Sequence, residues 1–164
     1  MLYYDISDEE RATVAYKNGF SIDKSTFRYA HDILSQATLI IPSIADEGMT
    51  DFEIERMLYS WMIKSYFRDG GLSSYYPVGA EDKCQNTAYG FINGYECNHL
   101  AWSSTFKMLC DMIGIPCATV NVEKTAGGAR DSINADYTVN VVRAAQRYQI
   151  SKGANRLNDL LLYF

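Results

Sequence analysis

The stretch Tyr89–Cys117, YGFINGYECNHLAWSSTFKMLCDMIGIPC, decides the fold that this sequence predicts. Residues 100–113 are apolar nearly all round a helical projection, which is typical of a helix buried on every side. Gly114 favours a helix end, and Pro116 cannot rejoin the helix. The stretch therefore predicts a central, buried helix with Cys97 at its N-terminus.

The position of Cys97 at the start of this helix favours a reactive thiol. Unpaired N–H groups and the helix dipole at a helix N-terminus favour a thiolate over a thiol, and the thiolate is the nucleophile. Gly90 and Gly94 come shortly before the cysteine and predict a loosened backbone there. The pattern indicates a candidate nucleophile at Cys97.

The Gly-x-x-Cys sequence that opens this apolar helix, with Gly-Ile-Pro at its end, is similar to bacterial transglutaminase-like domains. These are a branch of the papain-like cysteine enzymes. Residues 49–67 resemble the helix that the family carries upstream, and residues 86–90 resemble its lead-in. The resemblance covers residues 50–151 and implies that Cys97 is the nucleophile of a Cys-His-Asp triad.

The same resemblance places the two partners of the nucleophile on unexpected residues. The family's histidine, on the strand after the central helix, corresponds to Tyr137, and its aspartate corresponds to Ser151. Tyrosine, with an ordinary pKa of about 10, is a poor base near neutral pH. Serine cannot hold an imidazolium. The resemblance thus implies a degraded triad.

Three other residues are candidate bases. His99 follows Cys97 by two positions, which on one helix turns it to the opposite face. His31 belongs to an earlier amphipathic helix and is a boundary residue or a group folded over the cleft. Asp136 alternates to the opposite strand face from Tyr137. Cys97 is therefore either a packed cysteine in a retired site or a thiolate that reacts without a base.

Two main functions follow. The first is a non-catalytic module that binds protein or peptide in a groove near Cys97. The alternative is a cysteine acyltransferase, peptidase or amidase in which Cys97 attacks an amide carbonyl with a rebuilt base. A third hypothesis is a purely structural or toxin-related protein. Tyr75 and Tyr76, in a loop before the central stretch, either line the groove or cover the core.

Composition sets the remaining bounds. The 164 residues predict one domain, with an N-terminal helical part at 1–69 and a core at 86–164. A net charge of −5 argues against a nucleic-acid surface. No apolar run is long enough to span a membrane, and the N-terminus lacks a signal-peptide pattern. Without a CxxC pair we expect no metal or other cofactor. A cytoplasmic location is the expectation.

Local patterns predict the other elements. Ser-x-x-Glu and Thr-x-x-Glu capping boxes predict helices after Ser7 and Thr50. A further helix is expected after Ser21 or Asp23, and Pro42 either ends or bends it. Residues 71–85 predict a loop. Strands are expected at 116–123, 135–143 and 147–150, with a strand or apolar tail at 157–164. Helices first and strands later predict an α+β fold with a mostly antiparallel sheet.

Overall fold

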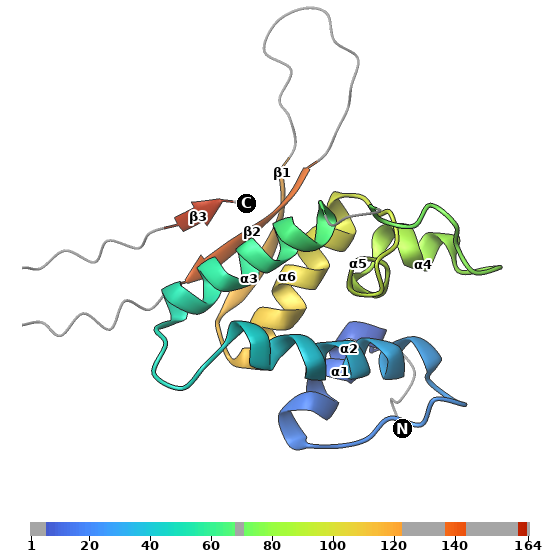
Figure 1. Cartoon of the computed structure of the whole chain (residues 1–164), viewed down its shortest axis with the longest axis horizontal. Coiled ribbons are helices and arrows are strands. Elements are labelled where there is room, and N and C mark those ends of the chain that lie inside the picture. The colour runs from blue at the N-terminus through green and yellow to red at the C-terminus, as the bar shows by residue number, and fades with distance from the viewer. Residues whose placement is uncertain (1–5, 68–70, 123–136, 144–160, 164) are drawn as a thin grey trace, which may run out of the picture.

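The computed structural model describes residues 6–67, 71–122, 137–143 and 161–163, and the side chains of 6–67 and 71–120. The helices and strands in chain order are α1 (Asp8–Asn18), α2 (Arg28–Ile44), α3 (Asp51–Tyr66), α4 (Glu81–Asn86), α5 (Ala88–Ile92), α6 (His99–Ile113), β1 (Cys117–Val122), β2 (Tyr137–Arg143) and β3 (Leu161–Tyr163). Helix α6 is central, and each of the other described helices contacts it (Figure 1).

The protein is mostly helical, and the prediction of an α+β fold packed on an antiparallel sheet is wrong. The described core lies between helices, and all six contribute buried apolar side chains to it. Strands do pair, antiparallel and in the order β1–β2–β3. However, Ala118, Thr119 and Val120 of β1 are exposed, and among the strand residues whose side chains are described Cys117 is the one that packs on the core. Alternation predicted the strand correctly but not what it covers.

The predicted central helix is confirmed as α6. Buried side chains occur on several of its faces, and Leu109 and Cys110 are fully buried. Gly114 ends it in the left-handed conformation, with φ of 95°, which only glycine adopts without strain. The chain then turns at Pro116 and enters β1, where Cys117 pairs with Val142.

Both predicted capping boxes are confirmed. Ser7 caps α1 by accepting from the Glu10 N–H, and the Glu10 carboxylate accepts from the Ser7 N–H. Thr50 and Glu53 make the same reciprocal pair at the start of α3. Each box satisfies backbone donors that have no partner inside the helix.

Helix α2 differs from its prediction at its start. It begins at Arg28, and Asp23 instead accepts hydrogen bonds from Ser25 and Thr26 in the preceding turn. Of the two effects predicted for Pro42, it does not end the helix, because the residue lies inside it. Ile41 and Ile44, on either side of the proline, are buried, so core packing offsets the missing backbone donor.

The segment predicted as a loop over 71–85 contains the start of α4. Helix α5 follows at once, and Gly90 belongs to it, in contact with the backbone of α4. A Cβ on Gly90 would lie 1.6 Å from the Cys84 carbonyl oxygen. Gly90 therefore permits close helix packing, and the expected loosening applies to Gly94, whose φ is 81°.

The described strands agree in position with three of the predictions. β1 lies within 116–123, β2 within 135–143, and β3 within 157–164. The strand predicted at 147–150 is outside the described residues. No described helix has the length and apolar character needed to cross a membrane.

Candidate functional site

Cys97 lies just before α6 and not on it. Asn98 is the N-cap, and its side-chain oxygen accepts hydrogen bonds from the N–H groups of Leu100 at 2.9 Å and Ala101 at 3.4 Å. These are the donors that would otherwise favour an anion at the helix start. The Asn98 side chain takes them, so they are unavailable to the Cys97 sulfur.

The environment of Cys97 favours the neutral thiol. Its side chain is partly buried and packs on the core, and this burial raises the pKa of the thiol from an ordinary 9.0 to about 12. Among the residues with described side chains, none forms a hydrogen bond with its sulfur. Burial thus opposes the thiolate that the sequence predicts at the helix N-terminus.

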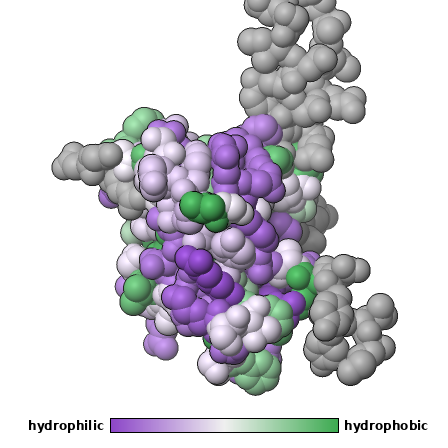
Figure 2. All heavy atoms as spheres, turned by 90° about the vertical axis from the view of Figure 1, so that its right-hand side faces the viewer, coloured by the Kyte–Doolittle hydropathy of each residue, from purple (hydrophilic) through white to green (hydrophobic). Residues whose placement is uncertain are grey.

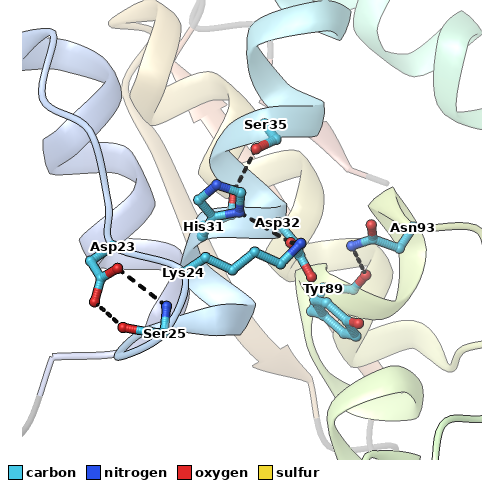
Figure 3. A network of polar contacts seen from close by, with 8 residues as sticks. All are labelled: Asp23, Lys24, Ser25, His31, Asp32, Ser35, Tyr89 and Asn93. Atoms are coloured by element: carbon cyan, nitrogen blue, oxygen red, sulfur yellow. Dashed lines mark hydrogen bonds and ion pairs between the residues drawn. The ribbon is translucent and has the colours of Figure 1, made fainter.

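His31, one of the candidate bases, makes its side-chain contacts with Asp32. Its Nδ1 lies 3.1 Å from the Asp32 carboxylate, and Lys24 reaches the same carboxylate at 3.1 Å. Figure 3 shows the three side chains meeting at the start of α2. Burial raises the pKa of Asp32, but the hydrogen bonds from His31 and Lys24 outweigh it and lower that pKa overall. His31 therefore belongs to a local network of polar contacts at the start of α2.

Of the other residues predicted to belong to the site, some lie in the part of the chain that the structure describes and some lie outside it. His99 is the first residue of α6 and is exposed, so the argument that placed it opposite Cys97 on one helix loses its premise. Tyr137 begins β2 opposite Val122, and only its backbone is described. Asp136 and Ser151 lie outside the described residues. The assignment of Tyr137 and Ser151 to the triad positions remains a prediction.

The backbone that leads into Cys97 is held by the loop before α4. Ser73 pairs with this segment: its N–H donates to the Gly94 carbonyl and its carbonyl accepts from the Glu96 N–H, both at 2.9 Å. The Tyr76 hydroxyl donates to the Glu96 carbonyl at 3.1 Å. The Asn98 N–H donates to Gln85, so α4 also fixes the approach to α6.

Aromatic rings continue this anchoring into the core. The Tyr76 ring packs on Tyr95, Tyr95 stacks on Tyr89, and Tyr89 meets Tyr29 of α2 edge-on with centroids 4.9 Å apart. Tyr76 thus covers the core, as one of its two predicted roles required. Tyr75 does not: its side chain is 86% exposed.

A second group of titratable side chains was not predicted. Glu55 on α3 is 1% exposed, and neither carboxylate oxygen has a hydrogen-bond partner among the residues that the structure describes. Burial, followed by the Asp51 charge, raises its pKa to about 7. A detectable signal existed, because Glu55 shares the helical spacing of the buried Leu58 and Met62. The described side chains include no cluster of three or more His, Cys, Asp or Glu suited to a metal.

Comparison with known proteins gives no relatives. No protein-family model, curated protein or solved structure matches the chain at a significant score. The similarity to transglutaminase-like domains therefore rests on the quoted residues of this sequence alone.

Proposed function

We propose that this chain is a non-catalytic module, of transglutaminase-like type, that binds protein or peptide next to Cys97. The observation that carries the proposal is the state of the Cys97 thiol. Its pKa of about 12 leaves almost none of it ionised near neutral pH, and no described side chain is bonded to it as a base. A cysteine acyltransferase needs an ionised thiol and a base in contact with it.

The binding surface proposed is the loop at 71–80 together with residues 94–96, which we call the tyrosine loop surface. Tyr75 and Val78 are its most exposed apolar side chains, and Tyr76 and Ser73 anchor the loop from beneath. An exposed tyrosine on an anchored loop is the kind of residue that dominates binding energies, because its ring is large and loses little entropy.

Charge favours a basic partner. Glu96 is exposed within the tyrosine loop surface, and Glu81 and Asp82 are exposed beside it. The whole chain carries a net charge of −5. Figure 2 shows that the face bearing α4 and α5 is mainly hydrophilic, with apolar residues scattered over it. A lysine- or arginine-containing peptide can pair with these carboxylates and stack on a tyrosine ring.

The experiment is a binding screen of the full chain on an array of basic, neutral and acidic peptides, followed by affinity measurement of the best binder. We expect Tyr75→Ala to weaken binding by about tenfold, as for a moderate interface residue. Phe20→Ala, which removes an aromatic side chain 63% exposed elsewhere on the surface, serves as the matched control and keeps full affinity.

The catalytic alternative is tested on the same preparations. Cys97→Ser is expected to bind the peptide as the wild type does, and neither protein is expected to hydrolyse it or transfer its acyl groups to an amine. Turnover that depends on Cys97 would contradict the proposal, as would equal loss of binding in Tyr75→Ala and Phe20→Ala.

A further inference from the structure

Glu55 lies in an otherwise apolar interface. Helix α3 packs on α2 and on α6, and its other buried side chains are Ile54, Leu58 and Met62. Every buried side chain of α2 is alanine or isoleucine, and the ionisable residues of that helix all lie at 28–32, the end away from its connection to α3. Both Glu55 oxygens are buried without a hydrogen-bond partner among the described residues, which is costly and calls for a reason.

The ionisable groups described around Glu55 do not compensate its charge. On α3 itself, the negative charge of Asp51 adds to burial in raising the pKa of Glu55. From α6, Cys110 carries a thiol whose pKa the charge of Glu55 raises, and Lys107 pairs with Asp111 of its own helix. An ionised Glu55 is therefore opposed by apolar side chains and by groups of its own sign, so ionisation works against the closed packing of α3.

The N-terminal half of α3, residues 51–58, is joined to its neighbours by apolar packing. Apart from the backbone ladder of α3, every hydrogen bond of residues 46–58 in the described chain stays within that segment. Asp46 and Met49 bond each other, as do Thr50 and Glu53. The N-terminal half can therefore leave the core without breaking a hydrogen bond to another element.

The C-terminal half of α3 is anchored by aromatic rings. Trp61 meets Phe91 of α5 with ring centroids 6.0 Å apart, and Tyr66 meets Trp102 of α6 at 5.2 Å. Aromatic pairs of this kind stabilise beyond the area that they bury. Movement that starts at Glu55 is therefore confined to the half of the helix before these rings.

We propose that residues 51–58 of α3 form a pH-operated latch, which is closed on α2 and α6 while Glu55 is protonated and is released when Glu55 loses its proton to water. The latch is separate from Cys97 and does not depend on the proposed binding function. Its opening exposes Ile54, Glu55 and Leu58, whose side chains are buried in the closed form.

The expected pH dependence follows from the two states of the latch. The pKa of Glu55 is about 7 in the closed form and 4.5 ordinarily, so between these values the closed latch holds a proton that the open one has lost. The equilibrium constant for opening therefore rises about tenfold per pH unit in this window, roughly three-hundredfold in all, and is constant above pH 7.

Amide hydrogen exchange of the full chain, resolved by NMR between pH 5 and 8, measures this opening. A short helical segment released from the core is marginal in water, so its amides exchange from the open form. After division by the intrinsic exchange rate at each pH, the opening constant at residues 55–58 should follow the predicted rise and plateau. Sub-denaturing urea should leave it unchanged, whereas exchange at Leu109 and Cys110 in α6 should accelerate with urea, because it requires global unfolding.

Two variants assign the effect to Glu55. Glu55→Gln keeps the shape without the charge and should make the opening constant independent of pH. Glu47→Gln removes an exposed carboxylate from the loop before α3 and should leave the wild-type profile intact.

Three results would overturn the proposal. The first is exchange at residues 55–58 with the same protection and urea dependence as α6, which would make the opening global. The second is a wild-type opening constant that does not change with pH. The third is a pH dependence that survives in Glu55→Gln or is lost in Glu47→Gln, because the proton would then belong to another group.

Discussion

Asn98 caps helix α6 with its side-chain oxygen, and Cys97, the residue before it, is thereby cut off from the helix N–H groups. A helix N-terminus activates a neighbouring thiol only when its donors or its field reach the sulfur. Here the donors are used by the cap and the sulfur is packed against the core. Proximity in sequence to a helix start is not sufficient for a reactive cysteine.

The first prediction concerns the reactivity of Cys97. Raising the pKa of a thiol from 9.0 to about 12 lowers its thiolate fraction near neutral pH by about a thousandfold. We expect the rate of iodoacetamide labelling of Cys97, followed by peptide mass spectrometry from pH 6 to 10, to show no plateau in this range. The denatured chain provides the control, with a plateau above its ordinary pKa. A folded-state plateau near pH 8 or below would contradict the burial argument.

The cap itself gives the second prediction. Asn98→Ala removes the acceptor for two N–H groups of α6 and should lower the free energy of unfolding by about 1 kcal/mol, measured by urea denaturation. Asn98→Asp is the matched control, because aspartate also caps helices and its charge suits the dipole. If alanine and aspartate were equally destabilising, the loss would not come from the cap.

The third prediction tests the contact of α5 with α4. Gly90→Ala places a methyl group 1.6 Å from the Cys84 carbonyl oxygen, so a backbone must move. We expect a loss of at least about 3 kcal/mol in the free energy of unfolding, the upper end for overpacking. Gly48→Ala is the control: its Cβ meets nothing within 4 Å, but φ is +93°, so it should cost only about 1 kcal/mol. Similar values for both variants would refute the close packing.

The fourth prediction is a pH dependence of stability from Glu55. Its pKa is about 7 when folded and 4.5 ordinarily, so between these values the folded protein holds a proton that the unfolded chain has lost. The free energy of unfolding therefore falls as pH rises through this window, by about 3 kcal/mol in total. Burial raises the pKa of Glu55, and the charge of Asp51 on the same helix raises it further.

Glu55→Gln isolates this contribution. The difference in stability between variant and wild type should grow in favour of the variant from pH 4.5 to 7 and remain constant above, as measured by urea denaturation at each pH. Other titrating groups cancel in the difference. A difference that does not change with pH would mean that Glu55 has the same pKa in both states.

Elements that depend on interactions between near neighbours in the chain could be predicted from the sequence. The capping boxes of Ser7 and Thr50 fix where α1 and α3 begin, because donor and acceptor lie three residues apart in the same turn. Gly114 fixes the end of α6, because the left-handed conformation suits glycine. The alternation at 117–122 gave β1 its position.

Tertiary structure alone decided the rest. Pro42 stays inside α2 because Ile41 and Ile44 are buried. Residues 118–120 of β1 were found exposed, since alternation does not say what covers a strand. The protonation of Cys97 and Glu55 depends on how much water the surrounding helices exclude, which no spacing encodes. Local hydrogen bonds are specified by neighbouring residues in the sequence, whereas burial is set by packing between segments far apart in the chain. Burial is what raises the pKa values of Cys97 and Glu55.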